Sequence, residues 1–477
     1  MDPSEFRRHG HALVDWIAEY LNGSERYPVL PRVAPGDVVK ALPGSAPERG
    51  ESFDAIIADF ERVLVPALTH WHHPGFFAYF AITASEPGVL GEMLAAALNQ
   101  QAMLWRTSPA STELEEVTLR WLARLMGLPD AFEGVIYDTA SVSSLHGLAA
   151  AREAAIPDVR NAGLAGRSNI SSTSVYCSEH AHSSIDKAVI LLGLGHRAVR
   201  HIQADDQFRM RVDALEAAIA ADRAAGTTPV AVVATAGTTS TTSVDPIREI
   251  AALCQREGIW LHVDAAYAGV AAIIPEYRLL FDGWEMADSI VVNPHKWLFT
   301  PVDVSAFYSR RMDMVRQAFS LVPEYLRTNE ASSVRNLMDT GIQLGRRFRS
   351  LKLWMVLRHF GAQGIRSFLA EHIRMARVFA QWVDADPDFE RLAPVPFSVV
   401  CFRARPVAVA NASSAELDAF NEKLLESVNA SGEIFLSHTR LQGRLSLRLA
   451  IGNLRTEERH VARAWQLLRE HTEQLLS

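Results

Sequence analysis

The chain has 477 residues, of which 48% are apolar and 21% are charged. This is the composition of a globular protein, which excludes a disordered chain, and the length predicts two or three domains. The formal net charge of −8, with no basic run, argues against a nucleic-acid partner. No stretch reaches the roughly 18 consecutive apolar residues of a membrane span.

The cysteines and the first residues bear on the cellular location. Three scattered cysteines, Cys177, Cys254 and Cys401, are too few for a disulfide framework or a zinc site. Met1 to Glu5 is polar and acidic, unlike a secretory signal. We therefore expect a cytoplasmic protein without a membrane partner.

The N-terminal part contains two predicted helices. Phe6 to Tyr20 places apolar residues at helical spacing, and Phe53 to Val65 has a similar pattern that Pro66 ends. Between them, Arg32 to Ser52 is rich in proline, glycine and charge, which predicts an extended connection. Trp71 to Phe80, WHHPGFFAYF, then concentrates aromatic residues that could form ordinary core packing or a domain seam.

A strand followed by a helix is predicted next. Before this strand, a helix is predicted to start near Ser108-Pro109. The two signals are proline in the first turn and a capping box over Thr112 to Glu115. Gly134 to Tyr137 predicts a short strand, followed by small hydroxyl residues and an alanine-rich helix from Leu145 to Ala155. Small residues at a helix start are commonly caps, yet free N–H groups and the helix dipole also suit a phosphate there.

Two further strands end in polar residues. Val175 to Cys177 precedes His180 and His182, which could be metal ligands, but no third ligand with suitable spacing follows, so we expect no metal. Thr228 to Ala234 is a continuous apolar run typical of a buried strand. The polar segment after it could simply be a flexible loop.

A lysine and an aspartate follow two neighbouring predicted strands. Trp260 to Val263 ends in Asp264, and Ile290 to Val292 is followed by Asn293, Pro294, His295 and Lys296. Alone, the lysine could lay its stem on apolar surface with its head in water, and the aspartate could be a helix cap. Together they match pyridoxal phosphate, which needs a lysine for its aldehyde and a carboxylate for its ring nitrogen.

The remaining chain predicts a long loop and a small C-terminal domain. A strand is expected over Val302 to Ser309, and Phe319 to Thr340 has no clean period, which is typical of a functional or disordered loop. A long helix is expected from Lys352 to Gly361 and Gly364. The expected elements of the tail are strand Phe397 to Arg403, helix Ser414 to Asn429, strands Glu433 to Ser437 and Arg444 to Ala450, and a final helix from Thr456.

Four motifs in this order make the chain resemble a known family: HAHSS (His180 to Ser184), HVDAAYAG (His262 to Gly269), NPHKW (Asn293 to Trp297) and LGRRFRSLKLW (Leu344 to Trp354). It resembles the group II pyridoxal-phosphate decarboxylases, and most closely the aromatic L-amino-acid decarboxylases, from about Phe6 to the last helix. The resemblance implies an α/β protein of pyridoxal-phosphate fold type I with a mainly parallel, doubly wound, seven-stranded sheet. The strands and helices that alternate between residues 134 and 310 favour the same architecture.

The resemblance also implies a domain division and a partner. We expect an N-terminal helical segment over residues 1–84, a large cofactor-binding domain over 85–365 and a small α+β domain over 366–477. In the family the N-terminal segment packs on a second subunit, so a homodimer with active sites at the subunit interface is expected.

The resemblance also implies a role for individual residues of this chain. Lys296, Tyr325, His182 and Asp264 are the expected catalytic residues, with Lys296 binding the cofactor aldehyde and Tyr325 protonating the alpha carbon. Further cofactor contacts are expected from Thr139, Ala140, Ser141, Thr239, Ala266, Asn293 and His295. The expected substrate pocket contains Trp71, Tyr79, Phe80, Thr83, Trp105 and Gly345.

The expected reaction is the pyridoxal-phosphate-dependent decarboxylation of an aromatic L-amino acid to its amine. Relatives that lack the tyrosine divert toward aldehydes, and this chain keeps Tyr325. The alternatives are a decarboxylase of an aliphatic or acidic amino acid, an aldehyde synthase, an aminotransferase and a non-catalytic relative of the fold. Gly345 leaves room for a larger ring, whereas serine at this position accompanies histidine or tyrosine as substrates.

Overall fold

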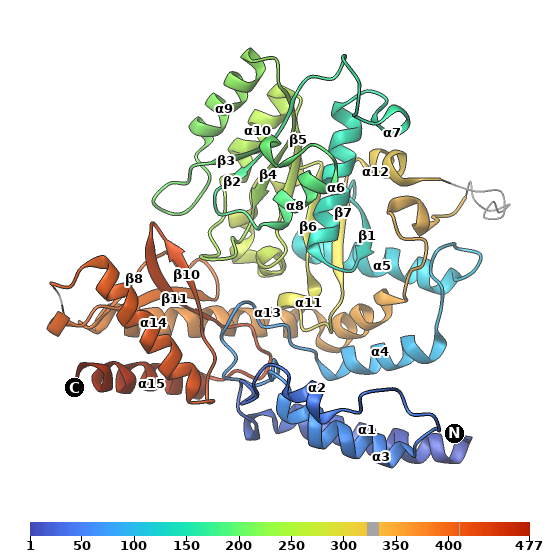
Figure 1. Cartoon of the computed structure of the whole chain (residues 1–477). Coiled ribbons are helices and arrows are strands. Elements are labelled where there is room, and N and C mark those ends of the chain that lie inside the picture. Colours follow the sequence, from blue (N-terminus) through green and yellow to red (C-terminus); the bar gives the residue numbers. More distant parts are fainter. Residues whose placement is uncertain (322–332, 410) are drawn as a thin grey trace. The chain divides into compact units, whose positions relative to one another are not determined.

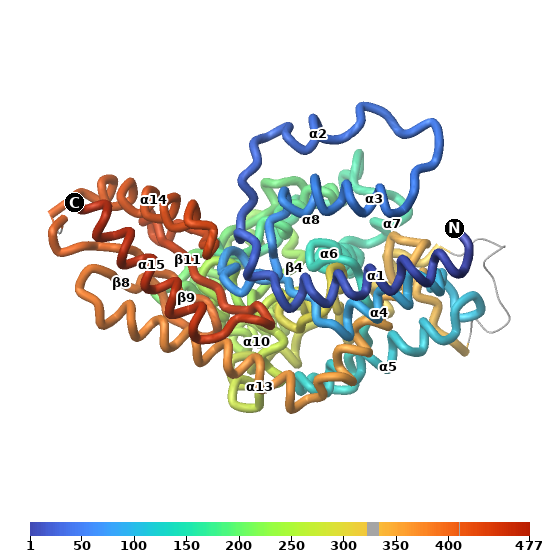
Figure 2. The backbone as a smooth tube through the Cα atoms, turned by 90° about the horizontal axis from the view of Figure 1, so that it is seen from below, coloured from blue at the N-terminus to red at the C-terminus, as the bar shows by residue number. Residues whose placement is uncertain are grey.

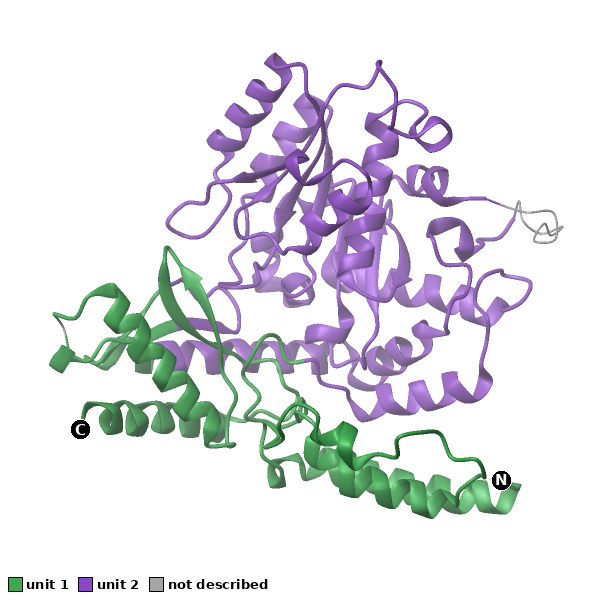
Figure 3. Ribbon diagram, in the orientation of Figure 1, with its two compact units in different colours: residues 1–81, 381–392, 402–477 green, residues 82–380, 393–401 purple. Residues whose placement is uncertain are grey.

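The computed structural model in Figure 1 describes residues 1–321, 333–409 and 411–477. The chain divides into two compact units, coloured separately in Figure 3. Unit 1 contains residues 1–81, 381–392 and 402–477, and unit 2 contains residues 82–380 and 393–401. The three-part division predicted with boundaries after residues 84 and 365 stays a prediction.

A seven-stranded mixed sheet organises the described part of unit 2, in the order β1-β7-β6-β5-β4-β2-β3. Neighbours from β3 to β6 are parallel, and β7 is antiparallel to both β6 and β1. The predicted fold class is therefore confirmed. The strands are β1 (Glu133–Tyr137), β2 (Thr173–Ser178), β3 (Val199–Ile202), β4 (Thr228–Thr235), β5 (Trp260–Asp264), β6 (Ser289–Val292) and β7 (Ser305–Ser309).

Both faces of this sheet are covered. Consecutive strand residues point to opposite faces, and every residue of β5 and β6 is buried. Helix α6 (Ala140–Ala155) contacts β4 to β7 and packs against α8 (Ser184–Leu191) and α12 (Met312–Phe319). Helices α9 (Val212–Ala224) and α10 (Ile247–Glu257) contact strands β3 to β5.

The other helices of unit 2 are α4 (Glu86–Leu98), α5 (Pro109–Met126), α7 (Val159–Ala162) and α11 (Pro294–Trp297). A long helix, α13 (Arg349–Ala385), begins in unit 2 and ends in unit 1. The helix predicted from Lys352 is thus confirmed, but it continues past Gly361. That glycine has φ +60°, which allows a local break without ending the helix.

Helix α5 begins with proline as predicted, but the predicted capping box is wrong. The Ser108 side chain makes no bond to the first helical N–H groups and instead donates to Gln100 Oε1 at 3.4 Å. In the box predicted over Thr112 to Glu115, Thr112 Oγ1 instead donates to Ser108 O at 3.0 Å, and Glu115 Oε1 accepts from the backbone N–H of Ile136 at 2.8 Å. Contacts of Ser108 with Gln100 and of Glu115 with Ile136 therefore take the place of the local motif.

In unit 1, α1 (Pro3–Asn22) lies beside α3 (Phe53–Asp59), with the short helix α2 (Asp37–Ala41) in the connection, as Figure 2 shows. The ring of Trp16 meets that of Phe60 at 5.2 Å, and Arg8 pairs with Asp54 at 3.2 Å. Both predicted N-terminal helices are confirmed. The C-terminal helices of unit 1 are α14 (Ser414–Ala430) and α15 (Glu458–Leu476).

The second sheet has the order β10-β11-β9-β8 among the described residues. Its strands are β8 (Phe389–Arg391), β9 (Val399–Ala404), β10 (Ser437–Leu441) and β11 (Arg444–Ala450). The strand expected over Glu433 to Ser437 is wrong, because Phe435 exchanges backbone hydrogen bonds with Gly75 and Phe77 instead. The strand that pairs with β11 starts only at Ser437.

Among the described residues, no helix is both long and apolar enough to cross a membrane.

A buried ion pair in unit 2 joins α5 to the segment directly before α13. Arg346 Nη2 lies 2.7 Å from Glu115 Oε1, and the two side chains are 3% and 1% exposed. The same carboxylate oxygen accepts from the backbone N–H of Ile136 at 2.8 Å. Removing the carboxylate would leave a guanidinium buried without its counter-charge.

We therefore expect Glu115→Ala to lower the free energy of unfolding by about 3–5 kcal/mol. The matched control is Glu116→Ala, which removes an exposed pair with Arg120 and should cost at most about 1 kcal/mol. Urea denaturation followed by circular dichroism measures both changes. Equal, small losses in the two variants would contradict a stabilising role for the buried pair.

Candidate active site

The predicted cofactor residues gather at one edge of the large sheet. Because β7 is antiparallel to both β1 and β6, β1 runs in the same direction as the parallel strands. The carboxyl ends of β1, β2, β4, β5 and β6 therefore share an edge, where open α/β sheets bind ligands. The residues that occupy or follow these ends are Thr139, Ala140 and Ser141 after β1, His182 after β2, Thr239 after β4, Asp264 and Ala266 at β5, and Asn293, His295 and Lys296 after β6.

Asp264 is the buried last residue of β5. Its Oδ1 atom accepts from the backbone N–H of Ala266 at 3.1 Å. The backbone here is held by β6, because Ala265 N–H donates to Val291 O and Asn293 N–H donates to Ala266 O, both at 3.0 Å. The carboxylate is thus fixed in place by two neighbouring strands.

Lys296 lies on the single turn α11, which begins at Pro294 directly after β6. Its backbone N–H donates to Asn293 O at 3.0 Å, and its side chain is half-buried. Proline cannot continue a strand ladder, so the chain turns at this point and presents the lysine at the edge.

His182 lies within electrostatic reach of both residues. Desolvation by the surrounding chain lowers the pKa of His182, the Asp264 charge opposes this shift, and the Lys296 charge adds to it. Its ring is still exposed, and Nδ1 lies 2.8 Å from Ser184 Oγ. The structure therefore brings His182, Asp264 and Lys296 together and favours a neutral imidazole.

Two aromatic residues lock the aspartate and lysine segments together, and sequence reasoning gave them no role. Tyr267 and Trp297 stack with ring centroids 4.8 Å apart and planes 5° from parallel. Trp297 Nε1 also donates to His372 Nδ1 at 3.0 Å. Tyr267 belongs to the motif HVDAAYAG and Trp297 to the motif NPHKW. Their places in these two motifs were the only sequence signal for the contact.

The hydrogen bonds of His295 determine how the Asn293 amide must point. The backbone N–H of Val304 donates to His295 Nδ1 at 2.9 Å, so Nδ1 is the acceptor and Nε2 carries the hydrogen. Burial lowers the pKa of His295 to about 4, which keeps the ring neutral. Nε2 lies 3.3 Å from Asn293 Nδ2, which would set two donors against each other.

Exchanging the amide oxygen and nitrogen of Asn293 removes this conflict, because the oxygen then accepts from His295 Nε2. The other end of the amide, an atom without a partner among the described residues, is buried. After the exchange this buried atom is an N–H donor at the edge that carries Lys296. A buried donor requires an acceptor, and an anionic ligand would supply one.

The start of α6 offers further donors. Thr139 occupies the cap position but makes no side-chain cap bond, so its hydroxyl does not satisfy the first N–H groups of the helix. The neighbouring Asp138 accepts from the backbone N–H of Thr139 at 2.8 Å and from Gln343 Nε2 at 3.2 Å. The helix therefore keeps the positive end of its dipole available at the edge.

The polar loop after β4 is ordered by its own hydroxyl groups, so the interpretation as a flexible loop is wrong. Thr241 Oγ1 lies 2.9 Å from Thr238 Oγ1 and 2.8 Å from Ser243 Oγ. Gly237 has φ +99°, and a Cβ there would lie 2.5 Å from Ala268 Cβ, so the turn requires glycine. Thr239 is exposed at its tip.

The predicted substrate residues of unit 2 lie on three loops. Thr83 is buried, and the nearby Ser85 donates from both N and Oγ to Phe299 O, at 2.9 and 2.8 Å, which ties this loop to the lysine segment. Trp105 N–H donates to Asn336 Oδ1 at 3.1 Å. A Cβ at Gly345 would lie 3.4 Å from Gln101 Nε2.

The other predicted pocket residues belong to unit 1, so their assignment to a pocket with Lys296 stays a prediction. Trp71 stacks on Tyr79, with centroids 6.2 Å apart. The Arg448 guanidinium lies 4.6 Å above the Phe80 ring and donates to Tyr79 O, which gives this arginine a structural role. Tyr325 lies outside the described residues.

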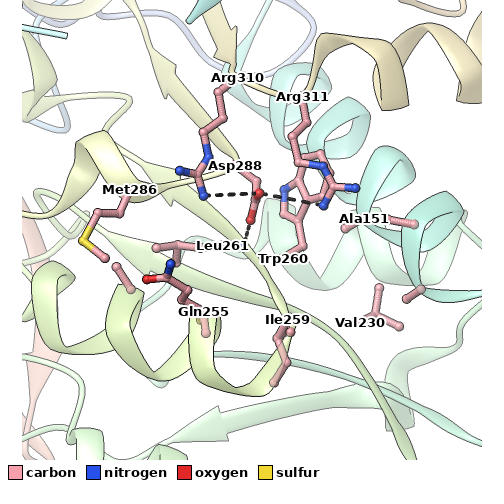
Figure 4. A pocket seen from close by; sticks show the side chains of 15 residues that line it. Ala151, Val230, Gln255, Ile259, Trp260, Leu261, Met286, Asp288, Arg310 and Arg311 are labelled. Atoms are coloured by element: carbon pink, nitrogen blue, oxygen red, sulfur yellow. Dashed lines mark hydrogen bonds and ion pairs between the residues drawn. The ribbon is translucent and has the colours of Figure 1, made fainter. Parts of the chain in front are cut away.

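A hollow of about 320 Å³ lies at the opposite edge of the sheet (Figure 4). Trp260 begins β5, Asp288 precedes β6, and Arg310 and Arg311 follow β7. Both arginines point toward Asp288, with N–O distances of 3.7 and 3.9 Å. The hollow is therefore separate from the edge that carries Lys296. Its two arginines already face the Asp288 carboxylate.

His262 stabilises the strand that carries Asp264, a role that the sequence analysis did not predict. It lies two residues before Asp264, with Nδ1 2.8 Å from Ser289 Oγ and Nε2 3.1 Å from Ser144 Oγ. These contacts connect β5 to β6 and to α6. Complete burial lowers the pKa of His262 from 6.5 to about 4.

This shift predicts a loss of stability in acid. Between pH 6.5 and about 4 the unfolded chain binds a proton on this ring that the native chain does not, so unfolding becomes easier as pH falls. The full effect, below pH 4, is about 3 kcal/mol. We expect His262→Gln, which keeps hydrogen-bonding groups but cannot titrate, to lose less stability between pH 7 and pH 5 than the unsubstituted chain.

Denaturant midpoints at the two pH values test this expectation, with the exposed His359→Gln as the matched control. Identical pH dependence in the unsubstituted chain and His262→Gln would contradict it.

Comparison with known proteins agrees with this geometry. Residues 35–405 match the model of the pyridoxal-dependent decarboxylase conserved domain. The chain is 40% identical to a tyrosine decarboxylase of Papaver somniferum, over 100% of this chain and 96% of that protein. It is 41% identical to a phenylacetaldehyde synthase of Arabidopsis thaliana, over 100% and 97% of the two chains.

Among solved structures, Oryza sativa TDC with PLP and tryptamine superposes with a TM-score of 0.96 and 37% identity, covering 100% of this chain and 99% of that one. The match covers the sheet edge described above as well as the rest of the fold. This chain belongs to the family of pyridoxal-dependent decarboxylases and is a pyridoxal-phosphate-dependent carboxy-lyase.

Proposed function

We propose that this enzyme removes the carboxyl group of an aromatic L-amino acid and releases the amine and carbon dioxide. The observation that carries this proposal is the convergence of Asp264, His182 and Lys296 at the carboxyl edge of the sheet. Full-length similarity to decarboxylases named for tyrosine and tryptophan supports the aromatic substrate. When bound, pyridoxal phosphate supplies an electron sink for the bond that breaks.

The residues present fit this cofactor. The Lys296 amine would bind the aldehyde, and the Asp264 carboxylate would hold a proton on the ring nitrogen by a charge-assisted hydrogen bond. The phosphate would accept from the buried Asn293 amide and from Thr139, Ala140 and Ser141 at the start of α6. The neutral ring of His182 would cover one ring face and Ala266 the other, with Thr239 and His295 at the margins.

Tyr325 has the proposed role of delivering a proton to the alpha carbon after carbon dioxide leaves. An alternative supported by the similarity to phenylacetaldehyde synthase is that the same chemistry ends in an aldehyde. Because this chain has a tyrosine at position 325, we favour the amine as the product. The ratio of amine to aldehyde distinguishes the two outcomes.

The proposed substrate pocket is mainly aromatic and combines Trp71, Tyr79 and Phe80 with Thr83, Trp105 and Gly345. Arg448, which lies 4.6 Å above the Phe80 ring, is already engaged by that ring and by a backbone oxygen, which disfavours an acidic substrate. A Cβ at position 345 would lie 3.4 Å from its nearest neighbouring atom, Gln101 Nε2, which is an ordinary contact distance. Glycine is therefore not required there by the fold, which supports a role in admitting a larger ring.

We also propose a homodimer with active sites at the subunit interface. The N-terminal helices support it, because apolar side chains on them are exposed, among them Phe6 at 69% and Ile56 at 48%. Sedimentation of the holoenzyme at the mass of one chain would contradict the dimer. Cys177, Cys254 and Cys401 are buried and form no disulfide, which supports a cytoplasmic location that cell fractionation tests.

A substrate panel tests the proposed reaction. Holoenzyme is incubated with tryptophan, 5-hydroxytryptophan, dopa, tyrosine, phenylalanine, histidine, glutamate or valine, and amine, aldehyde and carbon dioxide are quantified. We expect amine from at least one aromatic amino acid, no amino acceptor requirement, and selectivity over histidine, glutamate and valine of at least roughly tenfold. Release from glutamate or valine alone would contradict the aromatic assignment.

The matched variant for this assay is Tyr325→Phe, which removes only the hydroxyl group. It should raise the share of aldehyde at the expense of amine, because the proton donor is lost while the aromatic ring remains. Amine formation by Tyr325→Phe at the original rate would contradict the role proposed for Tyr325.

A further inference from the structure

A cluster of metal-ligating groups lies at the outer edge of the large sheet, on helices and strands that contain none of the proposed active-site residues. Asp186 belongs to α8, His196 to the 3₁₀ turn η4 (His196–Ala198), and His201 to the edge strand β3. One ligand atom from each of the three lies within 4.8 Å of the others. The side chains come from three consecutive elements that the fold brings together.

The two distances from Asp186 to the imidazoles are close to those of a tetrahedral metal site. Asp186 Oδ1 is 3.2 Å from His196 Nε2 and 3.0 Å from His201 Nε2. Two ligand atoms bound to Zn²⁺ at tetrahedral positions are roughly 3.3 Å apart. Only small movements of the two imidazoles would place all three atoms around one ion.

The surroundings suit three protein ligands and an open fourth position. Asp186 is held in place, with a side chain 18% exposed, whereas His201 is 44% and His196 is 70% exposed. Water can therefore reach the cluster and complete the coordination. Imidazole with one carboxylate is a ligand set for borderline dications such as Zn²⁺, not for Ca²⁺ or Mg²⁺.

A neighbouring side chain supports the required form of His201. Cys177 Sγ lies 3.7 Å from His201 Nδ1, on the strand paired in register with β3. Without a metal, His201 Nε2–H donates to Asp186 and Nδ1 accepts from the thiol. With a metal, Nε2 gives its lone pair to the ion and Nδ1–H donates to the sulfur, so both forms have partners.

We propose that Asp186, His196 and His201 form a binding site for a first-row transition-metal dication, with Zn²⁺ as the representative ion. The ion would join α8 to the edge strand β3 (Figure 1). Because α8 begins two residues after His182, the metal would also brace the segment that carries this residue. The exposed cations Lys187 and Arg197, next to two of the ligands in the chain, repel a dication and lower the expected affinity.

Calorimetric titration of the chelator-treated, dialysed holoenzyme with zinc chloride tests the site. We expect one Zn²⁺ per chain, and binding weaker by more than roughly tenfold in His196→Ala/His201→Ala and in Asp186→Asn. His359→Ala, which removes an exposed histidine of α13, should bind zinc like the unsubstituted chain. Zinc should raise the melting temperature of the unsubstituted chain and not that of the double variant.

Circular dichroism and the visible absorbance of the bound cofactor establish that each variant is folded and loaded. No saturable zinc binding by the unsubstituted holoenzyme, or equal affinity and stoichiometry in the folded double variant, would overturn the proposal.

Discussion

The active site depends on the pairing of β5 with β6, which sets the carboxylate of Asp264 beside the segment that carries Lys296. These strands are parallel and adjacent, so their carboxyl ends emerge at the same edge. Backbone hydrogen bonds from Ala265 to Val291 and from Asn293 to Ala266 continue the pairing beyond the strands. The side chains of Lys296 and Asp264 are thereby held at a partly buried edge, where electrostatic interactions are stronger than in water.

Several buried contacts keep this arrangement rigid. The Tyr267 ring stacks on Trp297, so the turn after β5 and the turn after β6 cannot separate without losing apolar contact area. Below them, His262 connects β5 to Ser289 of β6 and Ser144 of α6. In the position proposed for it, between His182 and Ala266, a cofactor ring would meet a preformed surface, which lowers the entropic cost of orienting it.

The sequence predicted those features that depend on local pattern. Short apolar runs ending in polar residues located β1, β2 and β4 to β6, and the residues that follow them identified Asp264, His182 and Lys296. Contacts between distant segments could not be predicted in this way. Ser108 bonds to Gln100 and not to its own helix, Phe435 pairs with Gly75 and Phe77, and Arg346 reaches Glu115 across much of the chain. The neutral His295, and with it the orientation of Asn293, also follows only from the bond to Val304.

The most direct test of this account is to locate the covalent attachment of the cofactor. Borohydride reduction of the holoenzyme, followed by proteolysis and mass spectrometry, should place a pyridoxyl group on the peptide that contains Lys296. Lys352, which is buried in an ion pair with Glu92 at 2.8 Å, should remain unmodified. Absence of the group from Lys296, or its presence on another lysine, would contradict the central claim that the turn after β6 holds the cofactor.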